Sequence, residues 1–253
     1  MANPFPRWIN TLPLQIVGAL IILGIGVSAA VTYYFTPKYA RVGYQPDQPV
    51  PYDHKLHVGQ LGMDCRYCHS FVENTGHANV PSASTCWNCH QHVKSDSPKI
   101  EPIRKAADKN YEDYDGKPVE WIRVHRAPDY VYFDHSAHVN RGVSCVSCHG
   151  DVGEMRVVHH DKSHSMSWCL DCHKEPEKHL RPLDQVFNLK WKPENLARED
   201  FRSYIEQRLG SEQAEELVPD SDKPLTQKVI GSVLKDLWHI RPPSGNNCSG
   251  CHR

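Results

Sequence analysis

All ten cysteines of this 253-residue chain fall into five Cys-x-x-Cys-His units, the spacing that attaches c-type haem to a protein. The two thiols of a unit add to the vinyl groups of a porphyrin, and the following histidine becomes the proximal ligand of the iron. We therefore expect five covalently bound haem c groups. Their attachment cysteines are Cys65, Cys68, Cys86, Cys89, Cys145, Cys148, Cys169, Cys172, Cys248 and Cys251. Their proximal histidines are His69, His90, His149, His173 and His252.

Zinc is the alternative for paired cysteines, because two Cys-x-x-Cys pairs can close a four-thiolate site. Five pairs are an odd number, and zinc does not require a histidine directly after each pair. Histidine makes up 17 of 253 residues, so chance would place one after all five pairs with odds of roughly one in a million. The spacing favours haem and leaves no cysteine for a disulfide or a nucleophile.

The composition indicates a haem-filled interior. Five haems in 253 residues would supply much of the core as porphyrin, and little strand-like alternation is visible. The formal net charge of −1 does not favour a nucleic-acid partner. We predict a mostly α and irregular fold, a multihaem cytochrome c with one amino-terminal transmembrane helix.

The amino-terminal segment 14–35 is apolar and carries no formal charge over 22 residues, which is long enough to span a bilayer as a helix. Trp8, Tyr33 and Tyr34 lie where interfacial aromatics are expected. A cleaved signal peptide, with Val27-Ser28-Ala29 as its cleavage site, is the alternative. Haem is attached outside the bacterial cytoplasmic membrane, so we expect a single-pass inner-membrane protein with its haem region on the periplasmic side.

An internal repeat organises the chain after a proline-containing linker. Residues 52–69 and 133–149 both contain aromatic-Asp-His-x-x-His-Val, then a glycine (Gly62 or Gly142), then a haem unit. A second haem unit follows each copy. The expected domains are an anchor at 1–36, a linker at 37–51, a tetrahaem region at 52–190 and a helical segment ending in the fifth site at 191–253.

The carboxy-terminal segment contains two amphipathic patterns, at 194–209 and 225–238. Both predict helices, with apolar stripes formed by Phe201, Ile205, Leu209, Val229, Val233 and Leu237. The helices either cover haems as a scaffold or form a docking face for a partner subunit.

The distal iron ligands should come from the remaining histidines and methionines. Each His-x-x-His pair, His54/His57 and His135/His138, places two imidazoles one helical turn apart, so one pair can serve two irons. His125 is a further distal candidate. Met166, Met155 and His239 follow, and a thioether ligand would raise the potential of its haem. His77, His159, His160 and His164 are weaker candidates.

The paired histidines resemble those of the small cytochromes c3 and c7. That resemblance implies that the first histidine of a pair serves its own downstream haem and the second serves another. His54 would then serve the haem at His69, and His135 the haem at His149. His57 and His138 would cross over to other haems.

The motifs VHRAPDYVYFDHSAHVNRGVSCVSCHG and SMSWCLDCH, with the single anchor, resemble the pentahaem subunit of alternative complex III, a bacterial quinol oxidoreductase. The resemblance covers nearly the whole chain and is most specific over 52–90 and 121–176. It implies electron relay from quinol oxidised at integral membrane subunits to a monohaem cytochrome c, a soluble carrier or a terminal oxidase. An iron–sulfur and molybdopterin-like subunit would be a neighbour.

Two other functions compete with this relay. A NapC/NrfH-type cytochrome would oxidise quinol itself and feed a periplasmic reductase, although the long linker weakens this interpretation. A catalytic multihaem reductase would need an open iron coordination site, and no unit here replaces its proximal histidine by lysine. We expect no substrate-converting site within this chain.

Overall fold

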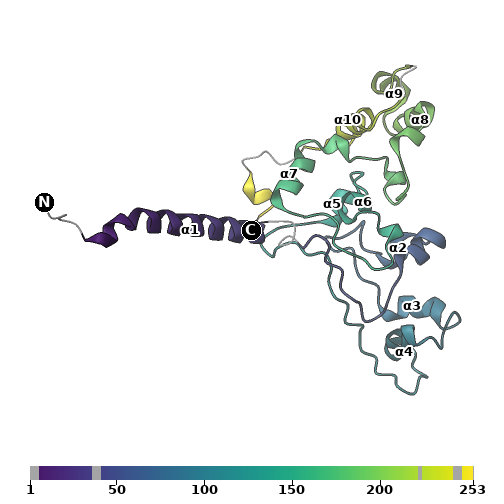
Figure 1. Cartoon of the computed structure of the whole chain (residues 1–253). Coiled ribbons are helices and arrows are strands. Elements are labelled where there is room, and N and C mark those ends of the chain that lie inside the picture. The colour runs from purple at the N-terminus through teal and green to yellow at the C-terminus, as the bar shows by residue number, and fades with distance from the viewer. Residues whose placement is uncertain (1–5, 36–40, 222–223, 242–246, 253) are drawn as a thin grey trace. The chain divides into compact units, whose positions relative to one another are not determined.

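The computed structural model describes residues 6–35, 41–221, 224–241 and 247–252 (Figure 1). They form two compact units, Met1–Gly43 and Tyr44–Arg253, each described here by itself. The domain boundaries expected at residues 51 and 190 fall inside the second unit and stay predictions.

The first unit consists of η1 (Arg7–Asn10) and α1 (Leu12–Phe35). Residues Leu12–Tyr34 have a mean hydropathy of 2.3, and none of this helix is buried against protein. It is long and apolar enough to cross a membrane, as predicted. The helix starts two residues before the expected Leu14, because Pro13 is tolerated in a first helical turn.

The second unit is built from short helices joined by irregular segments, and its described residues contain no β-strand. Two isolated bridges, Val131 with His252 and Val143 with Leu180, replace a sheet. The predicted fold class is confirmed. The elements are η2 (Lys55–Gln60, a π-helix), α2 (Cys65–Cys68), α3 (Ala83–His90), η3 (Pro98–Ile100), α4 (Glu101–Ala107), α5 (His135–Val139), α6 (Cys145–His149), η4 (Val152–Glu154), α7 (Met166–Lys174), η5 (Pro176–Lys178), η6 (Leu183–Gln185), η7 (Pro193–Asn195), α8 (Arg198–Leu209), α9 (Ser211–Leu217), α10 (Gln227–Leu237) and η8 (Cys248–Gly250).

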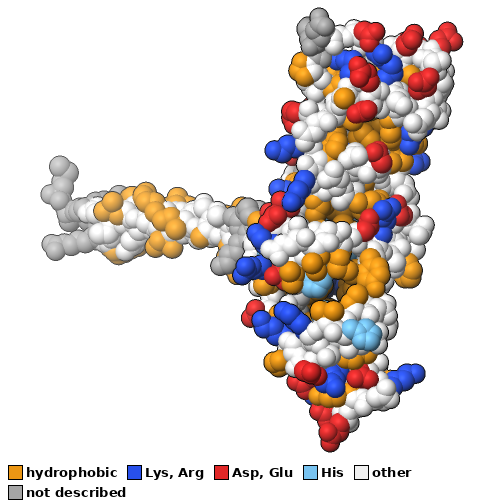
Figure 2. Space-filling view, turned by 90° about the vertical axis from the view of Figure 1, so that its right-hand side faces the viewer, with side chains coloured by type: hydrophobic (Ala, Val, Ile, Leu, Met, Phe, Trp, Pro, Cys, Tyr) orange, Lys and Arg blue, Asp and Glu red, His pale blue; other side chains and the backbone are white. Residues whose placement is uncertain are grey.

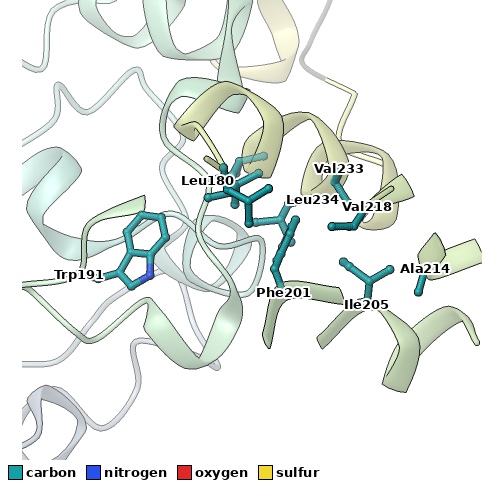
Figure 3. Close-up of a cluster of buried hydrophobic side chains, with 10 residues drawn as sticks. Leu180, Trp191, Phe201, Ile205, Ala214, Val218, Val233 and Leu234 are labelled. Atoms are coloured by element: carbon teal, nitrogen blue, oxygen red, sulfur yellow. The ribbon is translucent and has the colours of Figure 1, made fainter. Parts of the chain in front are cut away.

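The largest hydrophobic cluster lies in the carboxy-terminal helices (Figure 3). Phe201 and Ile205 of α8 meet Ile230 and Leu234 of α10, and all four are fully buried. The strong amphipathic pattern of the sequence therefore folds as expected in this region.

Three details of these helices differ from the sequence prediction. The segment Ser211–Leu217 forms an additional helix, α9. Leu209 is 38% exposed, because the chain turns at Gly210 immediately after it. Val229 is 43% exposed, because the buried face of α10 is centred on Ile230 and Leu234. Both residues were wrongly placed in the apolar stripes.

The region between residues 44 and 190 has only small hydrophobic clusters. Val50, Ile100 and Ile103 form one, and a second joins Val72, Val139 and Val186. Around the motifs, large apolar side chains remain exposed at the surface, a distribution also visible in Figure 2. Such side chains are available to cover another apolar body. They include Leu56, Leu61, Tyr67, Phe71, Val80, Tyr130, Tyr132, Phe133 and Met166.

Candidate haem-attachment site

Four of the five Cys-x-x-Cys pairs lie on short helices, α2, α3, α6 and α7. The fifth begins on η8 with Cys248, and Cys251 directly follows that element. Residues three apart share one face of a helix, so each turn presents two thiols together. Side chains cap two of these helices: Asp64 accepts from the backbone N–H of Arg66, and Ser165 from that of Trp168. The ten cysteines form no disulfide, which leaves every thiol available for a covalent bond.

The motifs, numbered one to five in chain order, come together in neighbouring pairs. Burial and then Cys68 of motif one raise the pKa of Cys86 in motif two, and burial followed by Cys65 and Cys89 raises the pKa of Cys68. Burial also raises the pKa of Cys148 in motif three to about 11, with Cys172 and Cys169 of motif four adding to the shift. Each copy of the repeat therefore forms a compact two-motif unit.

Two further contacts connect these units. The thiols of Cys65 and Cys145 lie next to each other, and their interaction lowers the pKa of Cys65 and raises that of Cys145. The pKa of Cys169 is raised by burial and then by Cys251 of motif five. The resulting spatial series is two, one, three, four, five, which differs from the chain order. In Figure 1, α3, α2, α6 and α7 follow one another along the unit in this series.

The two His-x-x-His pairs are held by the residue before them. The carboxylate of Asp53 accepts from Leu56 N–H, and that of Asp134 from Ser136 N–H. The backbone carbonyl of Asp53 accepts the Nδ1–H of His57 at 2.8 Å, and that of Asp134 accepts the Nδ1–H of His138 at 2.7 Å. This bond sets the tautomer and leaves Nε2 free to bind a metal.

The second histidine of each pair faces the second motif of its own copy. The ring centroids of His57 and His90 are 6.3 Å apart, and those of His138 and His173 are 6.1 Å apart. An iron held between two Nε2 atoms at about 2 Å each would separate the centroids by about 6 Å. Both pairs therefore fit axial ligation of one iron.

The first histidine of each pair lies beside the first motif of its copy. His135 and His149 have ring centroids 6.4 Å apart and nearly parallel planes, at 5°. The Nδ1–H of His135 donates to the carbonyl of Gly76 at 2.8 Å, so its Nε2 is also free. Burial and then the nearby His69 lower the pKa of His54 to about 4. The assignment implied by cytochromes c3 and c7 is compatible with these positions and stays a prediction.

An aromatic ring contacts both imidazoles in each copy, a role that residue spacing alone does not predict. Tyr52 stacks on His57, with centroids 4.4 Å apart, and meets His54 edge-on at 4.7 Å. Phe133 stacks on His138 and meets His135 edge-on, both at 4.8 Å. The signal was present in the repeat, where an aromatic residue precedes each Asp-His-x-x-His.

Two histidines of the Cys-x-x-Cys-His motifs are oriented in the same way. His69 donates its Nδ1–H to the carbonyl of Asn79 at 2.6 Å, and His90 to that of Val93 at 2.9 Å. Asn79 has a positive φ of 72°, a conformation that asparagine tolerates and that turns its carbonyl toward His69. Hydrogen bonds of this kind orient metal-binding imidazoles.

A cluster of histidines surrounds His149. The ring centroid of His125 lies 4.3 Å from that of His149, and that of His164 lies 6.3 Å away. His160 is 3% exposed and packs against both His125 and His164. Burial lowers the pKa of His125 to about 4, and its buried Nε2 has no hydrogen-bond partner, as suits an atom that binds metal. The 4.3 Å separation is too short for an iron between His125 and His149, so His135 fits that position better.

The remaining candidates are scattered. Met155 is buried, whereas Met166 opens α7 and is 63% exposed. His239 follows α10, and among the described residues no ring contact joins it to His252. His252 instead stacks on Tyr130, and the carbonyl of Cys251 accepts from Tyr132 N–H at 2.8 Å. The proposed distal roles of Met155, Met166 and His239 stay predictions.

The donor set fits haem. Five imidazoles donate Nδ1–H to backbone carbonyls, ring pairs are spaced for one iron, and apolar side chains flank the motifs. Haem bound here would supply one-electron redox centres. Across the described ranges, no three His, Cys, Asp or Glu side chains form a set that could hold a metal ion by themselves.

This fold and site define a multihaem cytochrome c. A family model described as cytochrome c7 and related cytochrome c matches residues 131–195. The chain is 33% identical over 158 residues to the menaquinone reductase multiheme cytochrome c subunit of Nitratidesulfovibrio vulgaris, a match that covers 54% of this chain and 71% of the relative. The chain belongs to the family of that multihaem cytochrome c subunit.

Proposed function

We propose that this chain is a pentahaem electron-transfer subunit of a membrane-bound, quinone-linked respiratory complex. The observation that carries the proposal is the connected spatial series of attachment motifs, two, one, three, four, five. Each motif in this series has a cysteine next to a cysteine of its neighbour in space. A series of closely spaced redox centres suits electron transfer, because the protein sets the position and potential of each centre.

The chain's own residues would hold and orient the five porphyrins. The ten cysteines bind them, and the five motif histidines take the proximal positions. His57, His138 and His135 take distal positions at the second, fourth and third motifs, in agreement with their ring distances. His54 serves the first motif. With both axial positions filled by protein, these haems have no open site for a substrate.

The proposed location is the periplasmic face of a bacterial inner membrane, with α1 as the anchor. Covalent haem attachment outside the cytoplasm supports this side. The proposed partners are integral membrane subunits that bind quinone, an iron–sulfur and molybdopterin-like subunit, and a monohaem cytochrome c. The relative's name, a subunit of a menaquinone reductase, supports a multisubunit setting.

The direction of electron flow has two candidates. The resemblance to alternative complex III favours quinol oxidation with delivery to a monohaem cytochrome, a soluble carrier or a terminal oxidase. The relative's name favours delivery to menaquinone. We propose quinol oxidation, and the purified complex tests it. Added quinol should reduce the haems, and a quinol-site inhibitor should block that reduction. If the haems accepted electrons only from a partner protein outside the membrane, and not from quinol, the proposed direction of electron flow would be reversed.

The haem count has a direct test. Intact-mass spectrometry of the full chain should show the mass of five haems, and the double variant Cys248→Ser/Cys251→Ser should show four. The matched control is Ser249→Ala, which changes the same loop without removing a thiol and should retain five. A wild-type chain without porphyrin mass would end the proposal.

A NapC/NrfH-type cytochrome is the second candidate, favoured by the single apolar helix Leu12–Tyr34. In that case the subunit, purified alone, would be reduced by quinol. The relay proposal expects no such reduction until the quinone-binding subunits are added.

A further inference from the structure

Arg181 lies outside the motifs, in surroundings that suit a residue that shifts the reduction potential of a neighbouring redox centre. It lies in the segment between η5 and η6, and its backbone N–H donates to the carbonyl of Gly142 at 2.9 Å. Gly142 has a φ of 85°, and a Cβ there would collide with the Arg181 carbonyl. The close approach of these two segments brings Arg181 to the start of α6.

The guanidinium group is held by neutral partners. Its Nη1 donates to Ser144 Oγ at 3.2 Å and to the carbonyl of Asn188 at 3.0 Å. The group also lies over the ring of Trp191, 5.0 Å from its centroid. Ser144 is 1% exposed and passes its own hydroxyl hydrogen to the carbonyl of Val186 at 2.6 Å. The position of the guanidinium is therefore set by neutral partners, of which Ser144 is buried.

This charge is not neutralised by a carboxylate. Among the described residues, no Asp or Glu forms an ion pair with Arg181. Arg66, which lies inside motif one, differs, because it pairs with Asp64 at 2.7 Å and also approaches Glu73. Burial lowers the pKa of Arg181 and the nearby Cys145 raises it, but arginine stays protonated in proteins. A fixed, half-buried cation thus lies next to Ser144, the residue before the first thiol of motif three.

We propose that Arg181 raises the reduction potential of the haem attached at Cys145 and Cys148. Reduction adds one negative charge to a haem, and a nearby cation in a partly desolvated setting stabilises that added charge. Motif three occupies the middle of the series, so its potential controls passage between the two ends. The proposal rests on the proposed function, because it requires haem at this motif.

The test is a spectroelectrochemical titration of the full-length holoprotein in detergent. Arg181→Gln should lower one of the five midpoint potentials by about 59 mV, which corresponds to a tenfold change in the equilibrium constant of a one-electron couple. Arg181→Lys keeps the charge and should recover most of the shift. Arg208→Gln removes an equal charge from an exposed position on α8 and should leave all five potentials unchanged.

Asn188→Asp provides a second route should Arg181→Gln fail to accumulate. Asn188 is exposed, and its backbone carbonyl accepts from the guanidinium. A carboxylate on this residue would add a negative charge near Arg181 without removing the guanidinium, so the same potential should fall. Unchanged potentials in both variants would overturn the proposal, as would equal shifts in Arg181→Lys and Arg181→Gln. Haem content is measured in parallel by mass spectrometry. Five haems with unchanged potentials reject this inference alone, whereas a wild-type chain without haem rejects the proposed function.

Discussion

The aromatic-Asp-His-x-x-His segment distributes its two imidazoles between two neighbouring attachment motifs. The aspartate carbonyl orients the second imidazole, and the aromatic ring contacts both. The arrangement recurs in the second copy with phenylalanine in place of tyrosine. The aromatic residue and the aspartate of the segment therefore position the imidazoles.

His57→Ala should convert the haem attached at Cys86 and Cys89 from low spin to high spin. The centroid of His57 lies 6.3 Å from that of His90, so the variant removes the imidazole that best fits the distal position. Optical and electron paramagnetic resonance spectra would show one of five haems changed. His92→Ala, at an exposed position after the same motif, is the control. A fully low-spin spectrum of His57→Ala would contradict the pairing.

Tyr52→Leu should change the ring orientation of His57 and His54 without removing a ligand. Aromatic pairs contribute about 0.5–1.5 kcal/mol beyond their burial, enough to bias a ring plane. The g-values of one or two low-spin haems should shift, since they depend on imidazole orientation. Tyr52→Phe should retain the wild-type spectrum, because Phe133 makes the same contacts in the other copy. Identical spectra for Tyr52→Leu and wild type would remove this role.

At the scale of elements, α10 is attached to the segment that follows motif four. Gln227 donates to the carbonyls of Glu177 and Leu180 at 3.0 and 2.8 Å, and Gly231 packs so closely on the Glu177 carbonyl that a Cβ would clash. Lys235 forms an ion pair with Glu177 at 3.3 Å. These contacts support the scaffold interpretation of the carboxy-terminal helices.

Acidic side chains gather over the α8–α9 end of the unit (Figure 2).

Lys235→Met should destabilise the protein at neutral pH by about 0.5–1 kcal/mol, the range for a partly exposed ion pair. A backbone hydrogen bond and Lys235 hold the pKa of Glu177 below its ordinary 4.5. A carboxyl group whose pKa is lower in the folded protein than in the unfolded one stabilises the fold at every pH above its pKa in the unfolded state. This contribution is lost as the pH falls through its pKa in the folded state. Denaturation of the holoprotein at pH 7 and below pH 4 measures the difference between variant and wild type. The difference should be present at pH 7 and vanish in acid, and Lys228→Met, exposed on the same helix, should show less of it. A difference that persists in acid would assign the effect to packing.

At the scale of the whole molecule, the attachment motifs do not follow one another in chain order. The neighbouring side chains of Cys65 and Cys145 join the two copies through their first motifs, which leaves motif two at one end. Motif five lies at the other end, next to Cys169. Electrons would then enter or leave at Cys86/Cys89 and at Cys248/Cys251.

A map of the intact holoprotein would measure this order through iron–iron distances. The iron ligated by His69 should lie between those ligated by His90 and His149. The iron of His252 should have the iron of His173 as its nearest neighbour. The series would be refuted if the distance between the irons of His90 and His149 were shorter than the distance between the irons of His69 and His149.

The sequence by itself determined the features that depend on local spacing. The Cys-x-x-Cys-His units and the repeat at Tyr52 and Phe133 follow from the identity of neighbouring residues, and segment 14–35 predicts its helix through length and apolarity alone. The burial of Phe201 and Ile205 was also predictable, because helical periodicity is local. Leu209 and Val229 were not, because the helix ends and the exact buried face depend on what packs against them.

Only the tertiary structure decided which motifs are neighbours and which histidine meets which motif. Cys65 and Cys145 are distant in the chain, as are Arg181 and Ser144, and no local pattern encodes their contact. These contacts arise because segments with little hydrophobic core of their own pack where backbone groups can pair, as at Gly142 and Arg181. Packing of that kind is a property of the whole chain, so residue spacing predicts the candidate ligands while the fold arranges them.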